Sequence, residues 1–503
     1  MKRADQHRRQ LMKGILGAAA IQGFPNIAFA NTGPRIRMEW QQFKETSQYQ
    51  SFLNAIAAMR QNTNPSDRGS LHYWVRAHQT YCPHDVAYFI SWHRGYLYYF
   101  EQQLRISSGD PTLNLPYWDY YSYATMPSEF TDPTPGNPLY LQRSGANVHN
   151  ALTLSPFAPE VFNFQRGTTN SFEARLESAP HNPVHNLIGG IMSTMQSPFD
   201  PIFYLHHANI DRLTHAWALP DGKGIPGTAN PYSSTNSSAY WAGSNLYAPQ
   251  LSIERYRTYY PGWLGYDYAD NTVPTTLPPA GGTQAGSTMQ AAAKTTQLVS
   301  LGRSSNRRPP FKQFARVPGR LISATRRSLG GAAQIDFDEQ SYSTSLNFSK
   351  KDAAEIAAIL AARRAGDDGA GEGRVGTIKL VVDRARLSEV GSRGGYFYAL
   401  YLNMPPVIES DSTYNKCFLG TLGAFEIAAA SHHGPAKLEF DLVGLLLQQK
   451  VEDVSNLSLS WVRVNGDNPP AGQTINVAEA RIDLSYEAAS LLPPAIELPG
   501  RYR

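Results

Sequence analysis

Histidine is the residue type in this sequence whose number and spacing most clearly suggest chemistry. Of the 13 histidines in the 503 residues, ten lie between positions 72 and 215. His181 and His185 are four residues apart, so a helix would present both rings on one face. Neutral imidazole is the commonest metal ligand among side chains. The crowding therefore predicts a metal centre built from histidines.

Two further histidines can share a metal ion only with a break in the helix. His84 and His93 are nine positions apart and would lie on nearly opposite faces of one continuous helix. Pro83, directly before His84, favours a turn or the start of a helix. The sequence therefore predicts that His84 lies outside the helix that carries His93.

Two adjacent histidines complete the pattern. His206 and His207 would be separated by about 100° on a helix, so only one can point squarely at a metal. Asp211, four residues after His207, could orient its ring or join a local polar network. The blocks contain no carboxylate at ligand spacing, and a site made of imidazoles alone suits copper. Two trios of histidine would imply two copper ions side by side.

Two stretches around these histidines form distinctive signatures. The first runs from Tyr81-Cys82-Pro83-His84 through FISWHRGYL at residues 89–97, and the second is DPIFYLHHANIDR at residues 200–212. Together they resemble the copper-binding signatures of type-3 copper proteins, the tyrosinases, catechol oxidases and molluscan hemocyanins. The resemblance implies a mainly α catalytic domain, built on a four-helix bundle around a dicopper site. It also implies two copper ions as cofactors and O2 as co-substrate.

The resemblance also assigns ligands by position in the signatures. Of the adjacent pair, the resemblance implies that His207 binds the second copper and that His206 does not. His72 remains an alternative to His78, because the stretch from His78 to His84 is shorter than in most of the family. The implied ligands of the first copper are His78, His84 and His93, and those of the second are His181, His185 and His207.

The family's reaction is the ortho-hydroxylation of monophenols and the oxidation of o-diphenols to o-quinones. Glu177 and Asn182 match positions that in the family hold a water molecule for removing the phenolic proton, which favours a tyrosinase with phenolic substrates. Thr194 falls near the family's gate residue over the first copper, and Cys82 matches a cysteine that forms a thioether with the histidine at His84. The alternatives are a catechol oxidase without monophenol activity and, less favoured, a hemocyanin-like O2-binding protein.

The net charge of +4 comes entirely from residues 1–30, which hold five basic residues and one acidic residue. This segment resembles a twin-arginine signal peptide, with Arg8-Arg9 and the cleavage pattern Ala28-Phe29-Ala30. We expect export to the periplasm or medium after cleavage near Ala30. The neutral remainder predicts no nucleic-acid partner, and the lack of an apolar run of about 18 residues predicts no membrane span.

Composition divides the rest of the chain into three parts. Residues 31–270 are the predicted catalytic domain, and residues 271–335, with nine basic and no acidic residues, are the predicted Pro/Gly/Ser-rich linker. Residues 336–503 show short alternating apolar runs between turns, which predicts an antiparallel β-sandwich. Residues 438–464 resemble the C-terminal domain of plant polyphenol oxidases. That resemblance implies an intramolecular shield over the copper site and a protease-sensitive linker.

Overall fold

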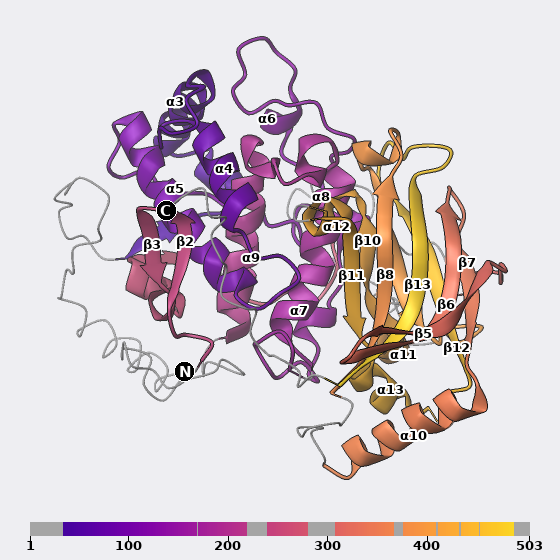
Figure 1. Cartoon of the computed structure of the whole chain (residues 1–503). Helices are drawn as coiled ribbons and strands as arrows, with labels where there is room; N and C mark the ends of the chain where they lie inside the picture. Colours follow the sequence, from indigo (N-terminus) through magenta and orange to yellow (C-terminus); the bar gives the residue numbers. More distant parts are fainter. Residues whose placement is uncertain are drawn as a thin grey trace.

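The computed structural model describes residues 34–168, 170–218, 239–279, 307–366, 376–408, 411–431, 434–451 and 453–486. The described chain forms a helical domain, indigo to magenta in Figure 1, beside a β-rich domain, orange to yellow. The predicted fold class, a mainly α domain followed by an antiparallel β-sandwich, is confirmed. None of the described helices has the length and apolarity needed to cross a membrane. The predicted leader, residues 1–30, lies outside the described residues.

The longest helices and the histidine-bearing helix α8 form the helical domain's centre. Helix α9 (Ile202–Ala218) is buried along its whole length and packs against α5. The main helices are α3 (Gln48–Gln61), α4 (Leu71–Tyr81), α5 (Phe89–Ser108), α8 (Asn182–Ile188) and α9 (Ile202–Ala218). The shorter helices are α2 (Trp40–Phe43), α6 (Ser128–Thr131) and α7 (Phe172–Leu176). The single turns are η1 (His149–Ala151), η2 (Ser155–Phe157), η3 (Glu177–His181), η4 (Gly190–Ser193), η5 (Ser197–Phe199), η6 (Arg255–Thr258) and η7 (Pro261–Leu264).

The break between α4 and α5 follows from local sequence. The Ser70 hydroxyl accepts the N–H of His72 and caps the start of α4. Helix α4 ends where Cys82 takes an extended conformation before Pro83, and α5 begins only at Phe89. His84 therefore lies in the connecting loop, outside the helix that carries His93, and this prediction is confirmed.

Two short sheets close the helical domain. Strand β1 (Arg35–Arg37) pairs in parallel with β4 (Tyr266–Tyr268), and β2 (Ser244–Ala248) pairs with β3 (Leu251–Glu254). Close packing is required where β2 meets α5, because a Cβ at Gly95 would lie 2.0 Å from the Tyr247 hydroxyl. These contacts bring the two ends of the predicted catalytic domain together.

The β-rich domain is a sandwich of two antiparallel sheets around one apolar core. One sheet has the order β10-β9-β12-β7 and the other β11-β8-β13-β6-β5. The strands are β5 (Ala315–Ser323), β6 (Arg326–Phe337), β7 (Tyr342–Asn347), β8 (Thr377–Leu387), β9 (Tyr396–Leu402), β10 (Phe418–Gly423), β11 (Ala436–Asp441), β12 (Asn456–Asn465) and β13 (Ile475–Ser485). Its helices are α10 (Lys350–Arg364), α11 (Asp411–Cys417), α12 (Ala424–Ala430) and α13 (Val443–Gln449), with the turn η8 (Gly391–Arg393).

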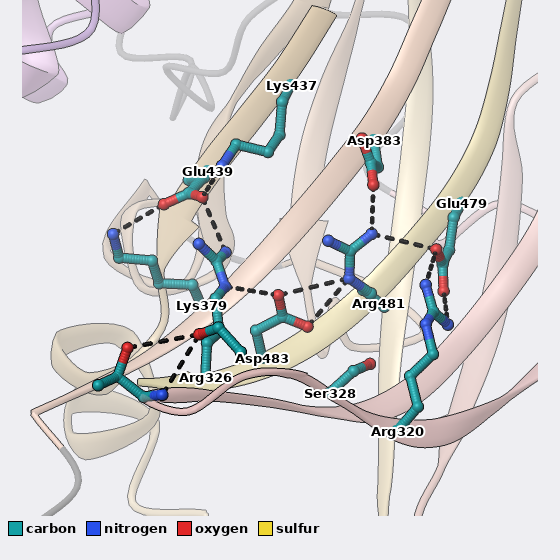
Figure 2. Close-up of polar contacts among 12 residues, drawn as sticks. Arg320, Arg326, Ser328, Lys379, Asp383, Lys437, Glu439, Glu479, Arg481 and Asp483 are labelled. Carbon is teal, nitrogen blue, oxygen red and sulfur yellow. Dashed lines mark hydrogen bonds and ion pairs between the residues drawn. The ribbon is translucent and has the colours of Figure 1, made fainter. Parts of the chain in front are cut away.

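The prediction of a linker over residues 271–335 is wrong for the last third of that range. Residues 315–335 form β5 and most of β6, which are strands of the five-stranded sheet. Two of their basic side chains, Arg320 and Arg326, are held by acids of the same domain, as Figure 2 shows. Arg320 binds Glu479 through two bonds of 2.7 and 2.6 Å, and Arg326 binds Asp483 at 2.8 Å. The sandwich therefore begins before residue 336, and acids on β13 neutralise Arg320 and Arg326 across the sheet.

The two domains share an apolar interface. Phe397, Ala399 and Tyr401 of β9, with Val462 and Val464 of β12, belong to the same buried cluster as the core of the helical domain. The other face of this sheet packs into the sandwich core. The sheet thus presents apolar side chains on both faces, and one of those faces covers the helical domain.

Candidate metal centre

The first histidine group gathers around the loop between α4 and α5. His78 near the end of α4, His93 on α5, and Cys82 and His84 in the loop each offer a ligand atom. These atoms lie within 4.8 Å of one another. The ring centroids of His78 and His84 are 5.1 Å apart, and those of His84 and His93 are 5.8 Å apart. The group is compact enough for one metal ion to contact all three rings.

The second group forms where η3, α8 and α9 meet, with His181 at the end of η3, His185 on α8, and His206 and His207 on α9. The Nε2 atom of His207 lies 3.3 Å from the Nε2 atoms of both His181 and His185. His206 belongs to the same group and stacks on His181 with ring centroids 5.3 Å apart. Among the described residues, neither ring nitrogen of His206 has a hydrogen-bond partner. The three nitrogens that converge most closely are those of His181, His185 and His207.

The tautomers of four histidines are set by their neighbours. An Nδ1–H donated to an oxygen leaves Nε2 with the lone pair that a metal requires. The Nδ1 acceptors are the carbonyl of Met195 for His78 (3.0 Å), that of Phe89 for His93 (2.9 Å), Oδ1 of Asn182 for His181 (2.8 Å), and the carbonyl of Met192 for His185 (2.7 Å). The fold therefore prepares Nε2 ligation at these positions.

Burial also keeps the rings neutral. It lowers the pKa of His185 to about 3, and it lowers the pKa values of His93, His181 and His207 well below the ordinary value. Repulsion between neighbouring rings adds to the effect. Neutral imidazoles with prepared Nε2 atoms and no carboxylate in either group fit copper ions.

Of the two predicted proton-handling residues, Asn182 contacts His181 of the second group, whereas Glu177 bonds the loop of the first group. Asn182 orients His181, as described above. Glu177 is fully buried in η3, where one oxygen accepts the N–H of Asp85 (2.8 Å) and the other binds Arg166 Nη2 (2.6 Å). Burial raises the pKa of Glu177 to about 8, although Arg166 opposes the shift. A residue with this pKa can exchange a proton near neutral pH.

The remaining predicted residues lie around these groups rather than in them. Asp211 does not orient His207 through any bond of the described residues; it binds Arg94 Nε (2.6 Å) and the hydroxyls of Tyr266 (2.5 Å) and Tyr268 (2.6 Å). Asp211 therefore joins a local polar network, which is the second of the two roles predicted for it. Thr194 bonds the Ile191 carbonyl and precedes Met195, the acceptor for His78. His72 packs against Phe199 and lies outside both groups.

One neighbour of the site could not be found from the sequence. Phe425, at the start of α12 in the sandwich, stacks on His185 with ring centroids 4.0 Å apart and an interplanar angle of 14°. The centroid of its ring also lies 5.5 Å from the ring centroid of His181 and 5.3 Å from that of His84. Figure 1 shows α12 beside α8 at the boundary of the two domains. No local motif marks Phe425, because its role depends on long-range packing.

Comparison with known proteins identifies the helical domain. The common central domain of tyrosinase matches residues 39–161 and 131–219. The helical domain belongs to the tyrosinase family. A tyrosinase from Hahella sp. (strain CCB-MM4) is 33% identical over 191 residues, which are 31% of this chain and 40% of that protein. A G-type hemocyanin of Enteroctopus dofleini is 30% identical over 177 residues, which are 29% of this chain and 6% of that protein.

The tyrosinase domain therefore spans well under half the length of these relatives. The fold resemblance extends further, to the structure of a latent apple tyrosinase, with a TM-score of 0.50 and 18% identity. It covers 93% of this chain and all of that one. Both domains thus have a counterpart of the same fold. In the tyrosinase domain the two histidine groups are the candidate sites for a pair of copper ions.

Proposed function

We propose that this chain is a tyrosinase-type polyphenol oxidase. The observation that carries the proposal is the pair of buried histidine groups, with Nε2 atoms prepared for ligation, inside a tyrosinase domain. The bound copper ions supply the activation of O2. A monophenol and O2 become an o-quinone and water, since one oxygen atom enters the ring at the ortho position and the other leaves as water. Two o-diphenols each give up two electrons and two protons to one O2, which yields two o-quinones and two water molecules.

The ligand assignment is part of the proposal. His206 is left outside the ligand set, since its nitrogens lack the short Nε2 approach that links the other three rings of its group. One copper ion is held by His78, His84 and His93, and the other by His181, His185 and His207.

Glu177 and Asn182 carry the step that distinguishes a tyrosinase from a catechol oxidase. Asn182 holds His181 through its amide oxygen, and Glu177 has a pKa suited to accepting a proton near neutral pH. We assign to them the removal of the phenolic proton from a monophenol, through a water molecule. Thr194 leaves room for the ring above the first copper.

Cys82 is proposed to form a thioether with His84. Its Sγ lies 3.7 Å from His84 Nε2, and the thiol is kept protonated because burial raises its pKa. The C–S bond would form as the Sγ–H bond and one ring C–H bond of His84 break, and the two electrons and two protons would pass to O2, the oxidant of the proposed function. The bond would fix the His84 ring and lower the mass by two hydrogen atoms. Mass spectrometry of the peptide that contains both residues tests this proposal directly.

The sandwich is proposed to act as an intramolecular shield. Phe425 lies against histidines of both groups, and its side chain is 1% exposed. A phenol approaching His185 from this side would have to displace the ring. The intact chain would then be a latent enzyme, as the latent apple tyrosinase of the same fold is named.

Export is proposed on the composition of residues 1–30. Their five basic residues and the Ala28-Phe29-Ala30 pattern favour a twin-arginine signal cleaved near Ala30, with delivery to the periplasm or medium. Replacing Arg8 and Arg9 with lysines should hold the chain in the cytoplasm of a producing cell. Fractionation that finds the variant exported as before would count against this route.

One experiment separates the candidate activities. Oxygen uptake is measured with a monophenol and with an o-diphenol, before and after limited proteolysis. A tyrosinase consumes O2 with both substrates, whereas a catechol oxidase does so only with the o-diphenol. Reversible O2 binding without consumption would favour an O2 carrier. The similarity to a hemocyanin makes this the alternative to test.

A further inference from the structure

A buried carboxylate joins the two histidine groups. Glu177 lies in η3, four residues before His181, yet one of its oxygens accepts the N–H of Asp85, the residue after His84. Its other oxygen binds Arg166. The Glu177 side chain therefore connects η3, which ends at His181 of the second group, to the loop that carries His84 of the first group.

The loop that carries His84 depends on such contacts. Asp85 and Tyr88 have φ values of 56° and 80°, in the left-handed region that non-glycine residues rarely adopt. Such a conformation is strained and persists only where its surroundings hold it. His78 and His93 are fixed by helices, but His84 is not. Its position is set by the contacts of the loop.

Arg166 is itself held in place. Its backbone N–H donates to Glu173 Oε2 (3.0 Å), and Glu173 Oε1 accepts the N–H of Ile90 in the first turn of α5 (3.3 Å). The guanidinium also lies 3.9 Å from Asp85 Oδ1. A charged carboxylate buried without a cation is costly, and the Arg166 guanidinium offsets part of this cost for Glu177.

We propose that Glu177 and Arg166 are positioning residues, which hold the His84 loop at the spacing from His181 that lets two copper ions bind side by side. The rings of His84 and His181 lie 6.3 Å apart and nearly parallel, with 27° between their planes. The inference rests on the copper site of the proposed function but not on the oxidation of any phenol. The positioning role adds to the proton transfer assigned to Glu177 and is measured separately from it.

Three variants and one control isolate the contact. Glu177→Gln keeps an oxygen for the Asp85 N–H but turns an amide toward Arg166, and Arg166→Met removes the cation. Arg166→Lys restores a positive charge that can reach Glu177. The control is Arg175→Met on α7, a half-buried arginine whose guanidinium bonds Asn170 Oδ1 (3.4 Å) rather than Glu177.

The measurement is copper retention by the full chain, without phenol. Each copper-loaded protein is dialysed against rising concentrations of a chelator, and the copper per chain is determined. For E177Q and R166M, we expect the chelator concentration that removes half of the copper to fall about 10–100-fold, as is usual when a partner of a metal ligand is lost. R166K should recover part of this loss, R175M should match the wild type, and the copper-free proteins should melt at similar temperatures.

Other results would overturn the positioning role. Wild-type copper retention in both E177Q and R166M would do so, and would leave proton transfer as the role of Glu177 if monophenol oxidation alone were lost. Equal copper loss in R175M would indicate general loosening instead. If R166M fails to fold, E177Q and R166K decide the question. A wild type that holds two copper ions but oxidises no phenol would end the proposed function and leave this inference standing.

Discussion

At the scale of single residues, four of the six proposed copper ligands have a neighbour that holds the ring through Nδ1, and Phe425 packs on three of the six, His84, His181 and His185. Its ring packs on His185 at a centroid distance of 4.0 Å but comes from the other domain. We expect Phe425→Ala to raise kcat/KM for an o-diphenol in the uncleaved chain by about tenfold or more, equivalent to about 1.4 kcal/mol. Oxygen uptake by the intact protein measures this change.

The matched control is Phe440→Ala, which shortens a half-buried phenylalanine packed on the sandwich core instead of on the histidines. If F440A activates the chain as much as F425A does, the gain comes from loosening of the sandwich. An F425A protein as inactive as the wild type would show that Phe425 does not block the substrate.

The residue scale also shows how far the sequence predicts the site. Spacing and Pro83 placed His84 outside the helix correctly, because helical periodicity is a local property. The partners of those rings were not predictable in the same way. The carbonyls of Met192 and Met195, the guanidinium of Arg166 and the ring of Phe425 reach the site only through tertiary packing.

At the scale of elements, the Asn186 side chain links α12 to α8 through two hydrogen bonds. Asn186 donates through Nδ2 to Glu426 Oε2 (2.7 Å) and accepts the N–H of Phe425 at Oδ1 (2.9 Å). A Cβ at Gly423 would lie 2.5 Å from this amide, so the strand before α12 must have a glycine there. The hydrogen bonds of Asn186 therefore set the position of Phe425.

We expect the contact between Asn186 and Glu426 to make the docking of the sandwich on the helical domain sensitive to pH. Burial raises the pKa of Glu426, and the nearby Asp85 carboxylate raises it further, while Asn186 and Thr421 oppose the shift. A carboxyl with a raised pKa stabilises the docked state fully below its undocked pKa, and this contribution is lost as pH rises through the docked pKa. We expect the o-diphenol activity of the uncleaved wild type, divided by that of Glu426→Gln, to increase with pH.

The ratio cancels the pH dependence of the chemistry, because both proteins carry the same site. Glu389→Gln, which alters a carboxylate that is 92% exposed, should give no trend when compared in the same way. A flat ratio for Glu426→Gln would exclude this carboxyl as the sensor.

Strand β5 shows why the element boundaries were less predictable than the histidines. It lies at the edge of its sheet, and most of its residues are exposed, so it lacks the alternating apolar pattern of a half-buried strand. Its Arg, Pro and Gly residues are those expected of a linker. Acids on β13, distant in sequence, neutralise Arg320 and Arg326 within the sheet.

At the scale of the whole molecule, the two domains are held by more than the connecting chain. The apolar face of β9 and β12 is buried against the helical domain, and each fully buried side chain of this kind contributes about 1.5–3 kcal/mol. Polar contacts border this face: Asp467 accepts the N–H groups of Ala146 and Asn147 (2.7 and 3.0 Å), and Gln448 donates to Asn170 (2.7 Å).

Cleavage between residues 280 and 306 should therefore not separate the domains by itself. We expect the cleaved protein to run as two fragments under denaturing conditions but to elute as one particle at the position of the intact chain. Its o-diphenol activity should stay low until a mild denaturant or the Phe425→Ala change uncovers the histidines. Cleavage that releases the sandwich and activates the enzyme in one step would mean that the connection, rather than the buried sheet face, maintains latency.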